Sequence, residues 1–182
     1  FVYQAINESL KLSMKKNKNV IMIGLGINDP KGFFGTSENL ILSSKGNRLF
    51  EFPTAENGMT GIAIGSSLMG LRPVITHQRV EFSLLSIEQV INQAAKWYFM
   101  TGGQKNVPIV IRLIIGRGWG QGPQHAQSLE TIFAQIPGLK VLCISSPNNA
   151  KGIIASAIED PNPVIIFEHR WVHELKGYVP KK

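Results

Sequence analysis

The chain has 182 residues, of which 43% are hydrophobic and 17% charged, and its formal net charge is +7. This composition suits one compact domain with a sizeable core, which we expect over residues 1–175, with 176–182 as a tail or the start of a linker. No stretch approaches the roughly 18 uninterrupted apolar residues of a membrane span. Nucleic-acid binding would require basic residues on one face or a known module. The lysines instead gather at residues 11–18 and in the tail, as is typical of solvated charges.

The single cysteine, Cys143, lies in an apolar run over residues 141–144. We expect a buried, unreactive thiol, and a reducing, cytoplasmic compartment.

Apolar segments alternate between helical and strand patterns along the whole chain. Helices are predicted over residues 2–14, 56–69, 86–100, 128–136 and 148–159. Strands are predicted over residues 20–24, 49–52, 72–77, 107–115, 140–145 and 163–168. The strands are continuous apolar runs, which is typical of a parallel sheet covered on both faces. We therefore predict an α/β fold with a mostly parallel sheet of about six strands and helices on both faces.

A glycine-containing helix start follows the second strand. Pro53 ends the strand because it has no N–H to donate, and Thr54 is the predicted N-cap, which puts Glu56 in the first turn. A carboxylate there also has a purely structural explanation, since the helix dipole favours it. Three glycines lie on one face of this helix: Gly58, Gly61 and Gly65. Each is less favourable than alanine by about 0.5–1 kcal/mol, so another backbone or a flat ligand is expected to approach closely.

Several familiar site patterns are incomplete. The run Gly24-Leu25-Gly26 follows a strand, but the third glycine and the acidic residue of a dinucleotide fingerprint are not in place. The loop at residues 116–122 has no Gly-Lys-Ser ending, so it is not a Walker loop. His169 and His173 have no matching third metal ligand and are interpreted as surface or packing residues.

Four segments carry a family resemblance: PTAENGMTGIAIGSSLMGLRP, IEQVINQAAKWYFMTGGQKNVPIVIR, QHAQSLETIFAQIPGLKV and SSPNNAKGIIASAIEDPNPVIIFEH. In order and spacing they resemble the N-terminal, pyrimidine-binding domain of the beta subunit of thiamine-diphosphate-dependent 2-oxo acid dehydrogenases. The resemblance covers most of the chain from Arg48 to His169.

The resemblance implies a half-site for thiamine diphosphate in a heteromeric enzyme, an oxidoreductase that decarboxylates a small 2-oxo acid. It implies an alpha-type partner subunit that holds the diphosphate with Mg²⁺, and assembly into a heterotetramer. The partner's signature, Gly-Asp-Gly followed by Asn about thirty residues later, does not occur in this sequence. This chain is therefore expected to hold at most the pyrimidine half of the cofactor.

The resemblance also assigns residues. It implies that Glu56 bonds the ring nitrogen of the aminopyrimidine and favours the imino tautomer, which leads to the ylid; burial would help the carboxyl hold that proton. Phe82 matches an aromatic that packs on the pyrimidine, and the alternative is an ordinary core aromatic. Gln78 falls at a pocket position that is often apolar or methionine. His125 matches a histidine that faces the active-site channel, and the alternative is a loop residue that caps the next helix.

A potassium site is implied at a turn after the last predicted helix. The resemblance assigns it to backbone carbonyls of Ile109, Ala157, Ile158, Asp160 and Asn162. Free carbonyls at a helix end suit a hard cation, and a plain helix-to-strand turn is the alternative.

Two positions depart from the family pattern. Leu25 stands where an acidic residue commonly lies near the cofactor, and Thr76-His77 replaces an acidic–aromatic pair. These departures motivate a second hypothesis, that the chain is a non-catalytic assembly or regulatory module on the same fold.

Overall fold

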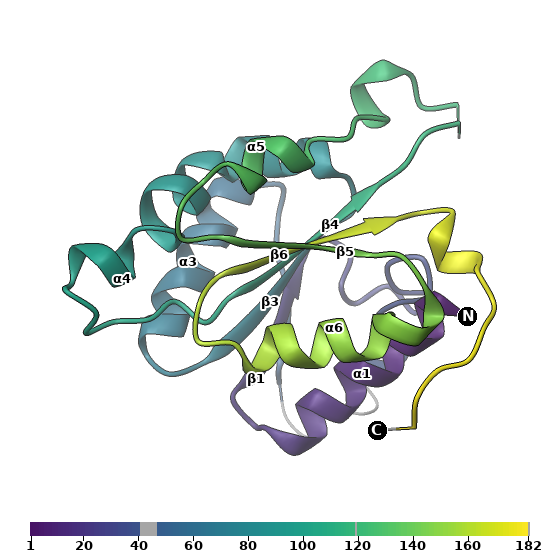
Figure 1. Cartoon of the computed structure of the whole chain (residues 1–182), viewed down its shortest axis with the longest axis horizontal. Coiled ribbons are helices and arrows are strands. Elements are labelled where there is room, and N and C mark those ends of the chain that lie inside the picture. Colours follow the sequence, from purple (N-terminus) through teal and green to yellow (C-terminus); the bar gives the residue numbers. More distant parts are fainter. Residues whose placement is uncertain (41–46, 119, 182) are drawn as a thin grey trace.

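The computed structural model describes residues 1–40, 47–118 and 120–181. Within these residues one sheet of six parallel strands forms the centre, in the order β2-β1-β3-β4-β6-β5 (Figure 1). The strands are β1 (Val20–Gly24), β2 (Leu49–Glu51), β3 (Arg72–His77), β4 (Val110–Ile115), β5 (Lys140–Ile144) and β6 (Val164–His169). The predicted α/β fold is confirmed.

Helices cover both faces of this sheet. On one face α1 (Val2–Lys16) packs beside α6 (Pro147–Glu159). On the other face lie α3 (Glu56–Leu68), the π-helix η2 (Gln89–Ala94) and α5 (Glu130–Ala134). The shorter helices are η1 (Val80–Ser86), α4 (Trp97–Met100), η3 (Pro123–His125) and η4 (Val172–Glu174).

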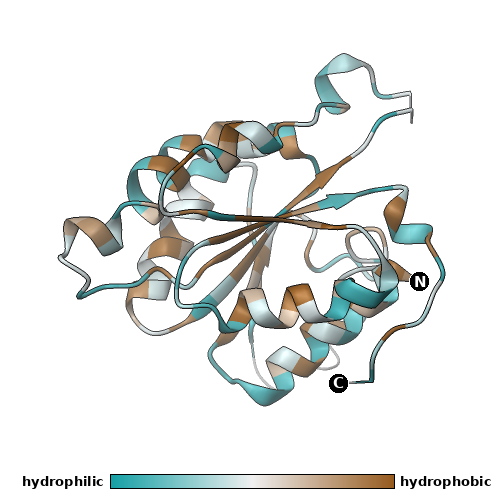
Figure 2. Ribbon diagram, viewed as in Figure 1, coloured by the Kyte–Doolittle hydropathy of each residue, from teal (hydrophilic) through white to brown (hydrophobic). Residues whose placement is uncertain are grey.

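The inner strands contribute side chains to two separate hydrophobic cores, because successive residues of a strand point to opposite faces of the sheet. In β3, Val74 joins the first core, under α1 and α6, whereas Ile75 joins the second core, under α3 and α5. Val110 and Ile111 of β4 divide in the same way. Figure 2 shows hydrophobic residues along the strands. Burial on both faces explains why these strands are apolar runs.

The order of the strands creates a switch point. β1 lies between β2 and β3, so the chain leaves β1 toward one side of the sheet and later returns to the other. In parallel sheets, ligands bind outside the carboxyl ends of the strands at such a point. Here those ends lead into Leu25 and Gln78.

The continuous helix predicted over residues 86–100 is wrong. The structure instead has η2 followed by the separate α4. The amide of Ala95 donates to the carbonyl of Val90 at 3.0 Å, five residues back, which widens the turn. A Cβ on Gly138 would lie 2.0 Å from the Ala95 carbonyl oxygen. The backbone after Pro137 therefore packs directly against the wide turn, and only glycine permits that approach.

The predicted N-cap role of Thr54 is also wrong. The helix α3 begins at Glu56 and Ala55 holds the cap position, with no side-chain cap. The amide of Ala55 donates to the carbonyl of Pro53 at 2.7 Å. This tight turn places the cap position at Ala55, one residue after the predicted Thr54, while the helix starts at Glu56 as predicted.

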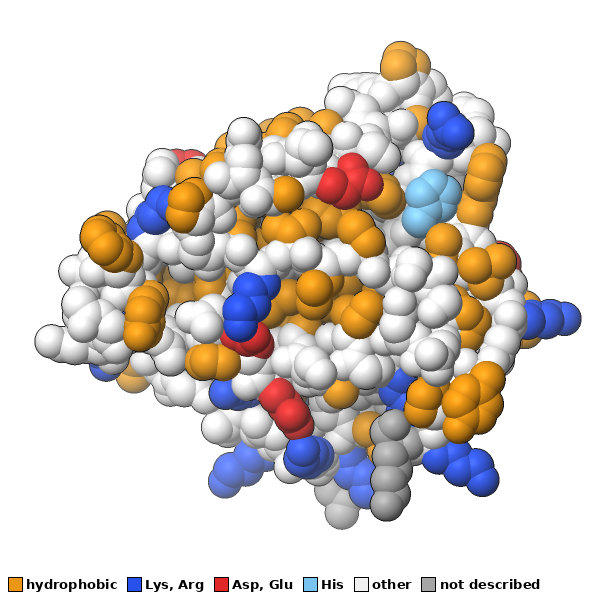
Figure 3. Space-filling view, viewed as in Figure 1, with side chains coloured by type: hydrophobic (Ala, Val, Ile, Leu, Met, Phe, Trp, Pro, Cys, Tyr) orange, Lys and Arg blue, Asp and Glu red, His pale blue; other side chains and the backbone are white. Residues whose placement is uncertain are grey.

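The thiol of Cys143 is exposed, which corrects the expectation of a buried cysteine. The reason is that β5 is an edge strand with β6 as its one neighbour in the sheet of the described residues. Figure 3 shows hydrophobic side chains gathered in the middle of the face across which β5 runs in Figure 1. Burial of part of the residue, and to a lesser degree Glu130, raises the pKa of this thiol above its ordinary 9.0.

Residues 176–181 form neither helix nor strand and pass the start of α6, where Gly177 lies next to Pro147. Val179 packs against the first core, and Lys151 donates to the carbonyl of Lys181 at 3.2 Å. Across the described part of the chain, every helix is too short or too polar to span a membrane.

Candidate functional site

A narrow pocket lies at the carboxyl ends of β1 and β3, which is the switch point of the sheet. Its walls come from the residue after β1, the start of α3, the end of β3, and η1. They comprise Leu25, Pro53, Glu56, Met59, Thr76, His77, Gln78 and Phe82. The enclosed free volume is only about 20 Å³. The pocket in this chain therefore has no room for a cofactor-sized ligand.

Glu56 is the first residue of α3 and the acidic group of the pocket. Its side chain faces the pocket although the residue is only 9% exposed. Among the described residues none donates a hydrogen bond to this carboxylate, whereas its backbone carbonyl accepts one from Thr60 Oγ1 at 2.9 Å. The helix N-terminus favours its negative charge. Its side-chain oxygens are thus available to a ligand with a donor.

Phe82 connects the pocket to the loop that carries His125. The two rings meet edge to face with centroids 5.5 Å apart. Two residues after His125, the amide of Gln127 donates to Glu81 Oε1 at 2.7 Å. Arg79 donates to Gln121 Oε1 through Nε at 2.9 Å and through Nη2 at 2.6 Å. The loop is therefore attached to the start of η1 at three points, with His125 beside Phe82.

The predicted residues Glu56, Gln78 and Phe82 thus line one pocket, and His125 lies next to it. The amide of Gln78 donates to the carbonyl of Leu25 at 2.9 Å, which bridges the ends of β3 and β1. Leu25, where the family pattern has an acidic residue, is itself part of the wall and 41% exposed.

His77 is the pocket residue that sequence analysis singled out only as a departure. The residue is 3% exposed, and Nε2 of its ring has no hydrogen-bond partner among the described residues. Burial lowers the pKa of His77 from 6.5 to about 4, because a charged imidazole would lose its hydration. The ring is therefore neutral at pH 7.

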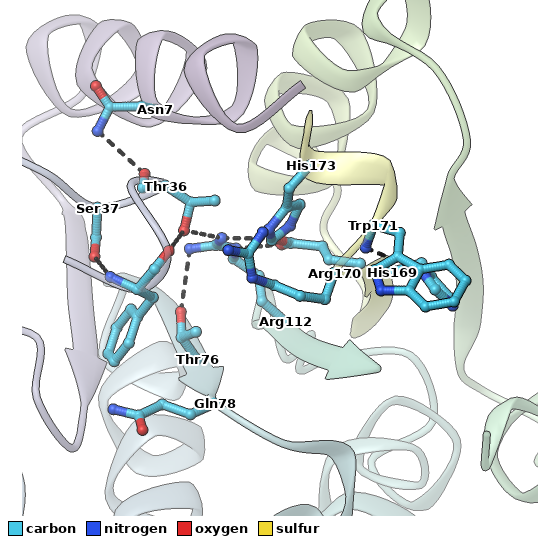
Figure 4. A network of polar contacts seen from close by, with 12 residues as sticks. Asn7, Thr36, Ser37, Thr76, Gln78, Arg112, His169, Arg170, Trp171 and His173 are labelled. Atoms are coloured by element: carbon cyan, nitrogen blue, oxygen red, sulfur yellow. Dashed lines mark hydrogen bonds and ion pairs between the residues drawn. The ribbon is translucent and has the colours of Figure 1, made fainter. Parts of the chain in front are cut away.

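A buried ion pair between β4 and β6 lies on the opposite face of the sheet, under α1 and α6 (Figure 4). Arg112 Nε donates to Glu168 Oε1 at 2.5 Å and Nη2 to Oε2 at 2.9 Å, and both side chains are fully buried. Arg112 also donates to Thr36 Oγ1 at 2.8 Å and to Thr76 Oγ1 at 3.2 Å. His173 Nε2 lies 3.1 Å from Glu168 Oε2. The network joins β3, β4 and β6 to the segment that follows β1.

Sequence analysis missed this network. Burial by itself would raise the pKa of Glu168, but the Arg112 charge and the His173 contact hold it well below its ordinary 4.5. The available signal was an arginine inside an apolar strand, because a buried charge requires a partner. Of the two histidines interpreted as surface or packing residues, His173 is buried against Glu168 in this network. The ring of His169 contacts the ring of Trp171.

The carbonyls assigned to potassium lie at the opposite ends of the strands from the switch-point pocket, near the amino ends of β4 and β6. The carbonyl of Ile109 accepts the amide of Val164 at 2.9 Å. The Arg72 guanidinium donates to the carbonyls of Ile158 at 2.7 Å and Asp160 at 3.0 Å. A cation of the protein itself therefore already lies at two of the five carbonyls.

A larger groove of about 540 Å³ also opens near the amino ends of β4 and β6. Its lining is mostly apolar and includes Tyr98, Phe99 and Pro163, and the Lys96 ammonium donates to the Pro137 carbonyl at 2.8 Å. The larger volume favours this groove as a ligand site, but the types of residue in the lining favour the pocket at the carboxyl ends of the strands. Only the smaller pocket combines a buried carboxylate, an aromatic ring and the switch point of the sheet.

The fold and this pocket define a doubly wound α/β domain with a pocket at its switch point. Residues 2–173 match the family described as transketolase, pyrimidine binding domain. The beta subunit of acetoin:2,6-dichlorophenolindophenol oxidoreductase from Cupriavidus necator is 37% identical over 97% of this chain and 55% of its own length. The beta subunit of the pyruvate dehydrogenase E1 component from Cyanidium caldarium is 35% identical over 99% of this chain and 55% of its own length.

Among solved structures, a split-gene transketolase in an inactive beta4 tetramer matches 93% of this chain and 51% of its own. Its TM-score is 0.73 at 19% identity, a likeness that shows the fold alone. The chain belongs to the family of transketolase pyrimidine-binding domains, which confirms the resemblance drawn from its sequence. It spans about half the length of the curated relatives it matches.

Proposed function

We propose that this chain is the pyrimidine side of a thiamine-diphosphate site in a heteromeric 2-oxo acid dehydrogenase. The observation that carries the proposal is Glu56, a carboxylate buried in the wall of the switch-point pocket with its oxygens free of donors from the described residues. When bound, thiamine diphosphate supplies the reactive carbon and the electron sink for decarboxylation.

The residues of the pocket fit the aminopyrimidine part of that cofactor. Glu56 would hold the proton shared with a ring nitrogen of the bound pyrimidine, and Phe82 would pack on the face of that ring. Gln78 is held by Leu25 and closes the wall between the strand ends. His125, on the loop beside Phe82, orients the substrate or the acyl acceptor at the open side of the pocket.

The other wall belongs to an alpha-type subunit in this proposal. The described residues contain no cluster of three His, Cys, Asp or Glu side chains that could hold a metal ion. We assign Mg²⁺ and the diphosphate to the partner, and the assembly to a heterotetramer. Potassium would use the carbonyls of Ile109, Ala157, Ile158, Asp160 and Asn162 only if Arg72 moved away from them.

The names of the relatives suggest which substrates to test. One name contains acetoin and another pyruvate. We propose a small 2-oxo acid, with pyruvate as the first compound to assay; acetoin, a hydroxyketone and not an acid, is the alternative substrate to test.

The test is to mix the chain with its alpha-type partner and titrate thiamine diphosphate with Mg²⁺. Near-ultraviolet circular dichroism reports the imino tautomer of the pyrimidine. Glu56→Gln should remove this band and turnover while far-ultraviolet dichroism stays unchanged. Glu8→Gln, in α1 on the opposite face of the sheet, is the matched control and should keep both. A Glu56→Gln complex with the band and full turnover would rule out the proposed role.

A non-catalytic module is the second candidate, because Leu25 occupies the wall position where an acidic residue was expected. That reading predicts that the assembled wild-type complex binds the cofactor without turning over pyruvate or acetoin.

A further inference from the structure

The side chain of His77 has an unusual position for a polar residue. It is the last residue of β3, an inner strand between β1 and β4. Alternation along the strand turns its ring to the same face as Ile75, toward α3, where Glu56 and Met59 line the pocket. His77 thus belongs to the same pocket wall as Glu56.

Nε2 of this ring has no hydrogen-bond partner among the described residues, although the residue is 97% buried, given its 3% exposure. A buried polar atom that is left unpaired destabilises the fold, and native structures rarely retain one without a reason. Apolar side chains supply much of the remaining wall, including Leu25, Met59 and Phe82. A group that enters the pocket would meet Glu56, Gln78 and His77 as polar contacts, and the amide of Gln78 already donates to the carbonyl of Leu25.

The protonation state of His77 limits which kinds of ligand could bind in the pocket. Burial lowers the pKa of His77 to about 4, so the neutral ring offers one N–H donor and one lone pair at pH 7. A neutral ring does not attract an anion by charge. It suits a neutral or weakly polar heteroaromatic ring with both donor and acceptor atoms.

We infer that Nε2 of His77 makes a direct hydrogen bond to the aminopyrimidine that binds against Glu56, and that His77 sets the orientation of that ring. The inference rests on the proposed function, since Glu56 anchors the same ring. It makes His77 a positioning residue of the half-site. A phenylalanine would fill the same place without the hydrogen bond, so the nitrogen is the part that matters.

Nitrogen NMR on the full chain tests this contact directly. The sequence has only four histidines, so labelling with ¹⁵N-histidine gives four imidazole patterns, and His77→Phe assigns one of them. The probe is 4-amino-5-hydroxymethyl-2-methylpyrimidine, titrated at pH 7. We expect the Nε2 resonance of His77 to shift with saturation and that of His169 to stay in place.

Three variants separate the hydrogen bond from the shape of the ring. His77→Phe should weaken binding of the probe about three- to tenfold, the usual effect of losing one neutral hydrogen bond. His77→Gln should restore most of the affinity, because its amide nitrogen can reach the position of Nε2. His169→Gln, outside the pocket, is the control and should bind like the wild type.

The outcomes distinguish this inference from the proposed function. If Glu56→Gln loses the probe while His77→Phe binds it normally without any Nε2 shift, a water satisfies His77 and the inference fails, whereas the role of Glu56 stands. If the Nε2 shift occurs and Glu56→Gln still binds normally, the role of Glu56 fails and the contact of His77 stands. If the wild-type chain binds no probe, the inference fails, while the holoenzyme dichroism still decides the proposed function.

Discussion

At the scale of single residues, the pair of Arg112 and Glu168 combines full burial with full charge. Breaking a buried pair from one side leaves the other charge uncompensated, which typically destabilises a protein by about 3–5 kcal/mol. We therefore expect Glu168→Gln to lower the free energy of unfolding by about that amount in urea titrations. Glu159→Gln removes a pair with Lys16 whose side chains are 64% and 77% exposed. It should change the free energy by no more than about 1 kcal/mol.

The carboxylate of Glu168 also makes the free energy of unfolding depend on pH in the acidic range. The pKa of Glu168 is lower in the folded protein than its ordinary 4.5, so its contribution is present above that pH and is lost as the pH falls through the folded value. Urea titrations between pH 5 and pH 3 should show this loss in the wild type. A Glu168→Gln protein with an equally steep decline over that range would contradict the assignment.

His77 adds a second pH dependence of the free energy of unfolding, which begins at a higher pH than that of Glu168. Its pKa falls from 6.5 to about 4 on folding, so the unfolded chain takes up a proton that the folded chain refuses. Stability is full above 6.5 and declines as the pH falls toward 4. Between pH 7 and pH 5 this linkage amounts to about 2 kcal/mol. His77→Phe should decline less than the wild type by that difference, and parallel declines would exclude the buried neutral ring.

The sequence predicted some of these residues and not others for a physical reason. Glu56 lies in a segment that carries the resemblance, and Gln78 and Phe82 lie between two such segments, so their convergence could be expected. Arg112 and Glu168 are 56 residues apart in the chain, and each lies in an apolar strand. Only the pairing of β4 with β6 brings them together, and no local pattern encodes that pairing.

At the scale of elements, α3 presents one face to the sheet and another to open space. A Cβ added at Gly58 or Gly65 would meet no atom within 4 Å. Between these glycines and beyond them, Ile62 is 57% and Met69 85% exposed. The glycines thus do not serve packing within this chain. They fit the expectation that a partner approaches α3 closely.

Gly65→Trp tests that face. It should leave the urea midpoint of the isolated chain nearly unchanged, because the space is open, and should prevent assembly with the alpha-type subunit in sedimentation experiments. Gly152→Trp is the matched control, since Gly152 in α6 also faces open space but on the other side of the sheet. Assembly of the Gly65→Trp protein at wild-type affinity would remove α3 from the interface.

The elements were predicted most accurately where the pattern is local. The apolar runs gave β1 and β3 with their observed bounds. The break in the helix over residues 86–100 could not be predicted from local sequence, because the wide turn at Ala95 packs against Gly138, some forty residues later. The edge position of β5 is likewise a property of strand order, so the exposure of Cys143 had no signal in its apolar neighbours.

At the scale of the whole molecule, two cores share one sheet. Leu10 belongs to the first core and Phe133 to the second, where its ring lies 5.9 Å from that of Phe167. Leu10→Ala should reduce the free energy of unfolding by about 2–5 kcal/mol and Phe133→Ala by about 3–5 kcal/mol. Because the strands belong to both cores, we expect each variant to unfold in one transition with an unchanged urea slope. Separate transitions by tryptophan fluorescence and far-ultraviolet dichroism would show that the cores are independent.

The exposed edge strand offers one practical opportunity. Cys143 is the single thiol of the sequence and lies on the surface. A maleimide dye can therefore be attached at one known position without removing any other cysteine. The raised pKa makes mildly alkaline conditions preferable for the coupling. With a second dye on a candidate subunit, energy transfer would measure docking distances in real time.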